Sequence, residues 1–186
     1  MDIILLRHTS SKDNELGVFS SPSTPLSSQG LEQVKELLDR KYPVSKIYSS
    51  PYKRSLVLAE ALSEKFNLPL ILDKRLREID FGDFEGKTFA QIQTLYPKEV
   101  EQWMEDPWAF VYPGGEDFHN VRSRVRRFYQ ELDESSLIIS HQALMFNLMA
   151  EILEYDYKDL SRFYLGSGAQ VHLKSNPWRL LSLENL

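Results

Sequence analysis

Two histidines of this sequence directly follow apolar runs, and imidazole can act as nucleophile, acid, base or anion ligand. His8 comes after Ile3 to Leu6 and Arg7, and His141 follows Leu137 to Ile139 with one serine between. Continuous apolar runs of this kind are typical of parallel strands buried on both faces. Ligands of doubly wound sheets bind outside the carboxyl ends of such strands. The sequence therefore predicts that His8 and His141 face one crevice, although histidines with a purely structural role at strand ends are the alternative.

An arginine after a third short strand offers an anion contact. Ser50 and Pro51 predict the cap and first residue of a helix, which places Arg54 at the helix N-terminus. Helix N-termini attract anions, and a guanidinium matches the geometry of phosphate oxygens. The alternative for Arg54 is a solvated surface arginine, and Lys53 is assigned to that role.

The elements that would position these residues alternate between strand-like and helix-like segments, which favours an α/β fold. We expect a three-layer sandwich with a mostly parallel, doubly wound sheet and helices on both faces. The predicted strands are residues 3–6, 47–48, 70–72, 137–139, 170–173 and 179–183, and the predicted helices are 31–38 with a serine cap, 51–66, 121–132 and 143–153. The last two strands are predicted to form a closing pair at the edge.

The segment from residue 75 to residue 118 differs in composition and is predicted to be an insert of loops and short helices that walls the site. Its aromatic residues either form a small core of their own, which we favour, or stack on a base or sugar. They are Phe81, Phe84, Phe89, Trp103, Trp108, Phe110 and Tyr112. Pro113 to Glu116 is interpreted as a turn into a helix. The arginines at 122, 124, 126 and 127 are interpreted as a solvated helical face, and His119 and His172 as structural.

Composition limits the classes of function. The 186 residues suit one domain, predicted over 1–186, and 42 % are hydrophobic, enough for a core without disulfides. The 22 Lys and Arg against 27 Asp and Glu give a net charge of −5, which argues against nucleic-acid and anionic-membrane partners. An anionic substrate would need a local basic pocket.

Cysteine is absent, which excludes disulfides, thiolate metal sites and cysteine nucleophiles. The N-terminal apolar run is too short for a signal peptide, and residues 137–153 contain polar side chains that argue against a membrane span. We therefore expect a cytoplasmic protein.

Four segments together resemble the histidine phosphatase (phosphoglycerate mutase-like) superfamily, in its order and spacing over residues 3 to about 150. They are Leu5-Leu6-Arg7-His8-Thr9, Ser49-Ser50-Pro51-x-x-Arg54, Leu76-Arg77-Glu78-Ile79-Asp80-Phe81-Gly82-Asp83-Phe84-Glu85-Gly86 and Ile138-Ile139-Ser140-His141. Each segment alone is a weak signal, whereas the set is specific. Asn14 and Pro25-Leu26-Ser27-x-x-Gly30 also fit this pattern.

The resemblance implies a metal-independent phosphomonoester hydrolase without a cofactor, acting on a small-molecule phosphate ester. His8 would be the nucleophile that forms a phosphohistidine. Arg7, Arg54 and a cationic His141 would hold the non-bridging phosphate oxygens, and Asn14 would add a neutral donor.

Glu78 would be the general acid, with its pKa raised by burial or by nearby carboxylates. Asp80, Asp83 and Glu85 could supply that like charge, and they are also rival candidates for the acid.

Thr9 and Gln142 stand where many family members have glycine after each histidine. Thr9 could add a hydroxyl donor to the phosphate, and Gln142 fits unless its backbone needs positive φ. Within the superfamily the chain looks most similar to α-ribazole-5′-phosphate phosphatases of cobalamin assembly. A broad-specificity sugar-phosphate phosphatase, a mutase-like phosphotransferase and a catalytically idle phospho-ligand or protein-binding module are the alternatives, and the oligomeric state is not predicted.

Overall fold

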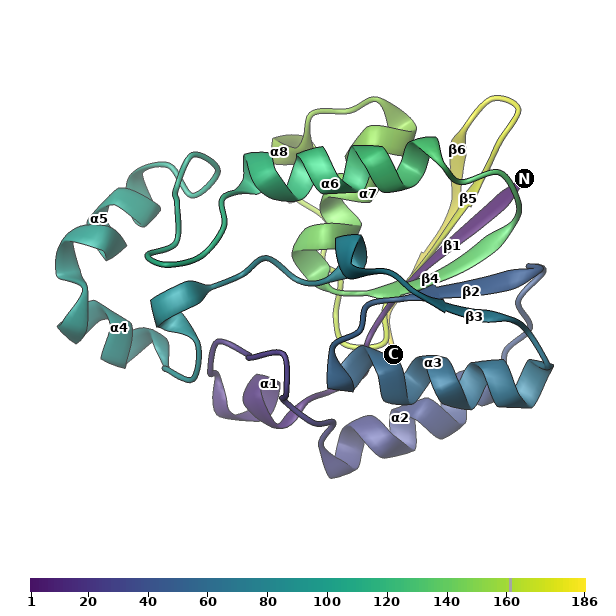
Figure 1. Cartoon of the computed structure of the whole chain (residues 1–186), viewed down its shortest axis with the longest axis horizontal. Helices are drawn as coiled ribbons and strands as arrows, with labels where there is room; N and C mark the ends of the chain where they lie inside the picture. The colour runs from purple at the N-terminus through teal and green to yellow at the C-terminus, as the bar shows by residue number, and fades with distance from the viewer. Residues whose placement is uncertain (161) are drawn as a thin grey trace.

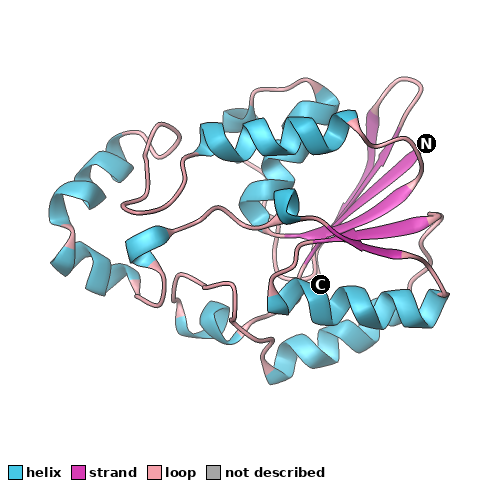
Figure 2. Cartoon of the chain, in the orientation of Figure 1, coloured by secondary structure: helices cyan, strands magenta, loops and turns pink. Residues whose placement is uncertain are grey.

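The computed structural model describes residues 1–160 and 162–186 of the chain. At its centre lies a twisted sheet with the strand order β3-β2-β4-β1-β5-β6 (Figures 1 and 2). The strands are β1 (Asp2–Arg7), β2 (Lys46–Ser49), β3 (Leu70–Leu72), β4 (Ser136–Ser140), β5 (Gln170–Lys174) and β6 (Arg179–Glu184). β1 to β4 are parallel, while β5 and β6 each run antiparallel to the preceding strand in this order. The mostly parallel sheet and the closing pair of strands are confirmed.

Helices cover both faces of the sheet and complete the predicted sandwich (Figure 1). The alternating side chains of β1 divide between two cores. Ile3 and Leu5 pack in the cluster with α6 (Phe118–Gln130) and α7 (Gln142–Leu153). Ile4 and Leu6 pack in the cluster with α2 (Ser28–Leu38) and α3 (Lys53–Phe66). Both clusters flank the strand that leads into His8, so packing on both sides fixes the position of that residue.

The segment 75–118 projects from one end of the sheet as loops and short helices (Figure 1). It holds the end of η1 (Lys74–Leu76), η2 (Gly82–Phe84), α4 (Phe89–Leu95) and α5 (Pro97–Glu105). Phe84 is fully buried and packs against Phe110 and Tyr112, with ring centroids 6.0 and 5.6 Å apart. Most of the aromatic residues therefore pack on one another, as favoured over stacking on a ligand. The separate core predicted for the segment was wrong, because Phe84, Phe110 and Tyr112 belong to the same buried cluster as Ile3 and Leu5 of β1.

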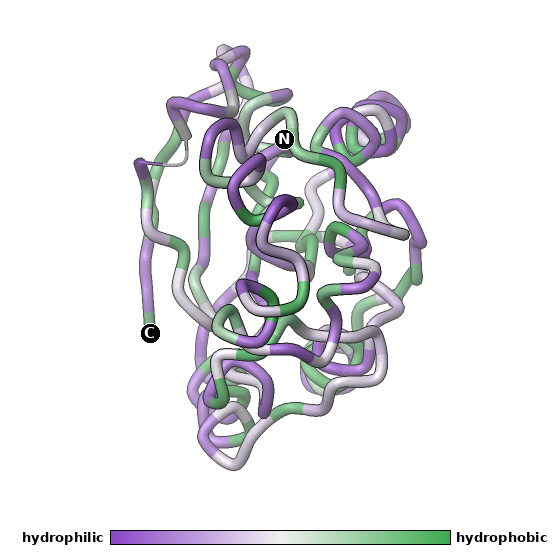
Figure 3. The backbone as a smooth tube through the Cα atoms, turned by 90° about the vertical axis from the view of Figure 1, so that its left-hand side faces the viewer, coloured by the Kyte–Doolittle hydropathy of each residue, from purple (hydrophilic) through white to green (hydrophobic). Residues whose placement is uncertain are grey.

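The remaining helices are α1 (Lys12–Leu16) and α8 (Tyr157–Leu160). Hydrophilic and hydrophobic stretches alternate along the outer coils in Figure 3, as amphipathic surface helices require. In the described part of the chain, no helix has both the length and the apolar character needed to cross a bilayer.

The predicted start of the third helix was wrong. α3 begins at Lys53 with Tyr52 as its cap residue, not at Pro51 with Ser50 as cap. The Ser50 hydroxyl oxygen does accept a bond from the backbone N–H of Tyr52 at 3.2 Å, but this bond belongs to the turn before the helix. The turn leaves Ser50 fully buried beside His141.

Candidate active site

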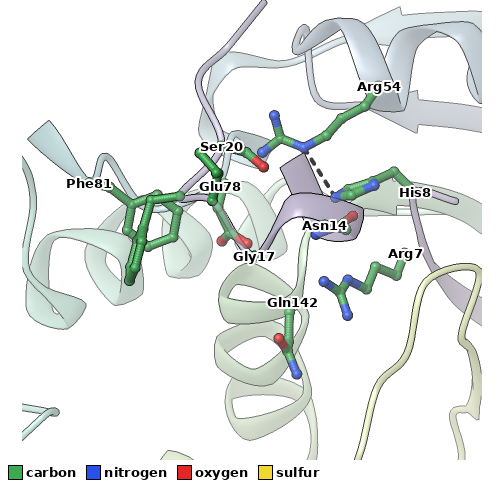
Figure 4. A pocket seen from close by; sticks show the side chains of 11 residues that line it. Arg7, His8, Asn14, Gly17, Ser20, Arg54, Glu78, Phe81 and Gln142 are labelled. Carbon is green, nitrogen blue, oxygen red and sulfur yellow. Dashed lines mark hydrogen bonds between the residues drawn. The ribbon is translucent and has the colours of Figure 1, made fainter. Parts of the chain in front are cut away.

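Most of the predicted residues line a cavity of about 200 Å³ at the carboxyl end of β1, whereas His141 and Thr9 lie behind its lining (Figure 4). Its lining comes from three regions: the end of β1 with the loop around α1, the start of α3 and α7, and the segment after η1. The lining residues are Arg7, His8, Asn14, Gly17, Val18, Phe19, Ser20, Arg54, Glu78, Phe81 and Gln142. The backbone N–H of His8 donates to the Ser140 carbonyl at 2.9 Å, which joins the ends of β1 and β4.

His8 is only 3 % exposed, and its hydrogen bonds define a neutral ring. Its Nδ1 lies 2.7 Å from the Thr9 carbonyl oxygen, and because a carbonyl only accepts, Nδ1 carries the proton. Arg54 Nε donates to His8 Nε2 at 3.1 Å, so Nε2 presents a lone pair (Figure 4). Burial, followed by the charges of Arg54 and Arg7, holds the pKa of His8 well below its ordinary value. The ring is therefore kept in the form that can attack an electrophile.

The two predicted arginines bring positive charge to this ring. Arg54 is the second residue of α3 and is almost fully buried, and its Nη1 donates to the Ser21 carbonyl at 2.7 Å. Arg7 donates from Nη1 to the Leu165 carbonyl, and its buried Nε has no hydrogen-bond partner among the described residues. Burial lowers the pKa of both guanidiniums, and the charge of Glu78 opposes that effect.

His141 is fully buried and caps α7, with its ring centroid 5.1 Å from that of His8. Its Nε2 lies 2.8 Å from the Ser50 hydroxyl and 3.4 Å from the Ser55 hydroxyl. Nδ1 is buried and has no partner among the described residues. Burial first, and then nearby positive charge, lowers the pKa of His141 well below its ordinary value. This direction favours the neutral ring and opposes the cation that the resemblance implied.

Glu78 is the predicted acid that lines the cavity, whereas its rivals Asp80, Asp83 and Glu85 do not. Its carboxylate accepts from the backbone N–H of Ile79 at 3.0 Å and is 8 % exposed. Burial raises the pKa of Glu78, against the opposing charges of nearby arginines. Of the two causes that the sequence offered for a raised pKa of Glu78, burial is therefore the one that acts. Like charge from the neighbouring carboxylates is not among the causes.

The three remaining candidates differ in their placement. Asn14 lines the cavity, and its side-chain oxygen is engaged by the backbone N–H of Ser11 at 3.1 Å. Gln142 also lines the cavity, and as the first residue of α7 it has no positive φ, so glycine is not required there. Thr9 is fully buried, does not line the cavity, and its hydroxyl has no partner among the described residues.

Sequence reasoning missed the wall formed by Phe19 and Ser20, and the contact of Ser50 with His141. Ser20 begins the Ser- and Pro-rich loop, whose composition signals a loop but not which residue faces a site. The interpretation of Arg124 as solvated was wrong: the side chain is 4 % exposed, because it lies on the buried face of α6. Its neighbour Arg126 is exposed and pairs with Glu151 at 2.8 Å.

Among residues 1–160 and 162–186, no three His, Cys, Asp or Glu side chains gather as metal ligands would.

Comparison with known proteins identifies a family. The model of the histidine phosphatase superfamily (branch 1) matches residues 3–185. Phosphoserine phosphatase 1 of Hydrogenobacter thermophilus is 32 % identical over 171 residues, which cover 87 % of this chain and 79 % of that protein.

Two solved structures are similar over the whole chain. The α-ribazole phosphatase of Shigella flexneri has a TM-score of 0.85 and 26 % identity, and the similarity covers 100 % of both chains. A protein from Escherichia coli described as a putative α-ribazole-5′-P phosphatase has a TM-score of 0.91 over 100 % of this chain and 96 % of its own. At 23 % identity, that second likeness establishes the shared fold.

Proposed function

The chain belongs to the histidine phosphatase superfamily and is a phosphoric monoester hydrolase, and from this premise we propose that it acts through a phosphohistidine on His8. The observation that carries the proposal is the neutral His8 ring. Its Nδ1 proton is bound to the Thr9 carbonyl and its Nε2 lone pair faces the Arg54 guanidinium. Nε2 is thus the attacking nitrogen, and Arg54 occupies the side on which a phosphoryl group would arrive.

In the first step, the hydrogen bond from Arg54 Nε to His8 Nε2 breaks and the Arg54 N–H donates to a phosphate oxygen instead. The freed Nε2 lone pair of His8 then forms a bond to phosphorus while the ester P–O bond breaks. Protonated Glu78 gives its proton to the leaving oxygen, which departs as the alcohol. Arg7, Arg54 and the unpartnered Nδ1 of His141 supply donors for the three non-bridging oxygens. These donors are buried, and burial strengthens their interaction with developing charge.

In the second step, a water molecule attacks phosphorus and the N–P bond breaks. The Glu78 carboxylate takes a proton from that water, and the electron pair of the broken bond returns to His8 Nε2. Inorganic phosphate leaves and the acid is again protonated. The pKa of Glu78, raised by burial, suits this alternation because the same group must give and take a proton near neutral pH.

We further propose α-ribazole 5′-phosphate as the first substrate to test, with phosphoserine as the second candidate. The likeness to the Shigella flexneri enzyme supports the former, and the Hydrogenobacter thermophilus relative supports the latter. Within the described lining, Arg7 and Arg54 are the only Lys or Arg side chains, and the phosphoryl group engages both. The aromatic side chains of the same lining are Phe19 and Phe81. This composition favours an ester with one phosphate over a bisphosphate.

The test is hydrolysis of a phosphomonoester panel in the presence of EDTA, with His8→Ala as the control. The panel contains α-ribazole 5′-phosphate, phosphoserine, 3-phosphoglycerate, fructose 2,6-bisphosphate and p-nitrophenyl phosphate. We expect turnover that His8→Ala abolishes. Single turnovers quenched in alkaline denaturant, in which the acid-labile phosphohistidine survives, should carry substrate phosphate on His8. Transfer between hydroxyls with a phosphorylated primer would instead indicate a mutase. Phosphate binding without turnover on any ester would indicate a binding module and refute the proposal.

A further inference from the structure

Arg124 reaches from the buried face of α6 to the backbone of the segment that carries Glu78. Its Nη2 donates to the Glu78 carbonyl oxygen at 3.1 Å, and its Nη1 donates to the Arg75 carbonyl oxygen. The side chain does not line the cavity. Its two guanidinium nitrogens therefore hold the main chain at the acid and three residues before it.

Glu116 holds the same segment on the other side of the acid. Its Oε2 accepts from the backbone N–H of Asp80 at 3.1 Å and from Arg124 Nη2 at 3.1 Å. Its Oε1 pairs with Arg77 at 2.6 Å. Its own backbone N–H donates to the Asp80 carbonyl at 2.9 Å. One carboxylate thus fixes the residues on both sides of Glu78.

The loop that carries Glu116 presses directly on this segment. A Cβ added at Gly115 would lie 2.3 Å from the Asp80 carbonyl oxygen, so only glycine allows this approach. The backbone around Glu78 is consequently fixed at residues 75, 78 and 80 by groups outside the cavity. At residue 77 the side chain is held, by its ion pair with Glu116.

From these contacts we propose that Glu116 and Arg124, the acid clamp, are positioning residues for Glu78, an inference that rests on the proposed function. Neither side chain lines the cavity, and both hold the backbone that aims the Glu78 carboxyl. The Arg124 charge also opposes the rise in the pKa of that carboxyl. A buried ion pair is weak evidence for stability, because desolvation offsets its attraction and apolar residues can replace it. What this pair supplies is a set of directional hydrogen bonds, and general-acid catalysis depends on such placement.

The test uses the different need of leaving groups for a proton. p-Nitrophenolate leaves without one, phenolate needs it more, and a benzyl alkoxide needs it most. The measured quantity is kcat/KM for p-nitrophenyl, phenyl and benzyl phosphate, because it reports the steps up to release of the alcohol. The later step, in which Glu78 acts as base, does not enter this constant. The variants are Arg124→Met and Glu116→Gln, compared with Glu78→Gln.

We expect Arg124→Met to lower kcat/KM for benzyl phosphate about 100-fold and to leave p-nitrophenyl phosphate nearly unchanged. Glu116→Gln should also lower kcat/KM most for benzyl phosphate and least for p-nitrophenyl phosphate, with smaller losses. Glu78→Gln should show the largest difference in kcat/KM loss between these esters. The matched control is Arg126→Met, which removes an arginine from the exposed face of the same helix and should change none of the three rates. Activity retained on p-nitrophenyl phosphate also demonstrates that each variant is folded.

Equal losses on all three esters, or no loss on benzyl phosphate, would overturn the acid clamp. If Arg124→Met does not fold, the conservative Glu116→Gln decides by the same criterion. Failure of the proposed function has a different signature, because wild-type protein would then hydrolyse none of the esters above the His8→Ala background.

Discussion

Keeping two histidines neutral in a buried site makes the stability of the fold depend on pH. His8 and His141 are both buried, and the pKa of each is held well below the ordinary value of 6.5. In the unfolded chain both rings take up a proton near that value. Since the folded pKa is the lower one, the stabilisation is complete above pH 6.5 and is lost as the pH falls below it.

The size of this loss follows from proton linkage. When the pH falls from about 7.5 to about 5.5, each histidine that stays neutral in the fold lowers the free energy of unfolding by up to about 1.4 kcal/mol. Two such histidines lower it by up to about 2.8 kcal/mol. For a chain of this length, about 1 kcal/mol corresponds to a shift in Tm of about 2–4 °C. Each buried histidine should therefore add about 3–6 °C to the fall in Tm over this range.

The assay is thermal unfolding, followed by circular dichroism, of wild type, His8→Gln, His141→Gln and the double variant. The buffers must be free of phosphate, because an anion bound beside the rings would favour their protonated form. The measured quantity is the fall in Tm between the two pH values. When this fall is compared between a variant and wild type, the contributions of the other titrating groups cancel. His119→Gln is the matched control, since that ring is exposed on α6.

We expect the fall in Tm on acidification to be smaller in His8→Gln and in His141→Gln than in wild type, and smallest in the double variant. A double variant that falls in parallel with wild type would refute the reasoning, because the acid sensitivity would then come from other groups. The functional meaning is direct. The same burial and arginine charges that keep His8 neutral for attack make the fold sensitive to acid.

Three further substitutions probe the site. Arg54→Lys removes the donor to His8 Nε2 and the planar guanidinium. It should lower kcat/KM on every ester about 10²- to 10³-fold with little change in Tm. An unchanged kcat/KM would exclude the guanidinium from phosphoryl binding. Ser50→Ala removes the hydroxyl from His141 Nε2 and should lower kcat about tenfold, with Ser50→Thr restoring most of it. Gly30→Ala would place a Cβ 1.9 Å from the backbone oxygen of Ser10, in the loop after β1. The free energy of unfolding, measured with denaturant, should fall by about 1–3 kcal/mol or more.

The sequence predicted the centre of this fold because its strongest signals are local. The apolar runs that became β1 and β4 are continuous, and parallel strands buried on both faces require such runs. The two histidines follow at the strand ends, where parallel pairing brings them together. Asn14, Gln142, Arg54 and Glu78 line the cavity, and Arg54 also contacts His8.

The interpretations that failed concern burial and partners, which local patterns do not contain. Ser50 has the residue type of a helix cap, but the turn before α3 directs its hydroxyl to His141, a residue 91 positions away. Asp80 lies near Glu78 in sequence and was one of the two sources proposed for a raised Glu78 pKa, through like charge, the other being burial. In the fold, its carboxylate instead accepts from the backbone N–H of Gly82 at 2.9 Å, and burial is what raises the pKa of Glu78.

Arg124 combines a feature that the local pattern predicts, its burial, with one that the pattern does not predict, its partners. Val121, Val125 and Phe128 form the buried face of α6, and residue 124 falls on that face by helical spacing, whereas residue 126 does not. The periodicity thus contained the signal that one arginine of the four points inward. It did not contain the partners, because the Glu78 carbonyl and the Glu116 carboxylate belong to the insert, whose path helical periodicity does not define. An arginine at an inward position of an amphipathic helix therefore predicts a buried hydrogen-bonding partner elsewhere in the chain, since the charge is too costly to bury without one.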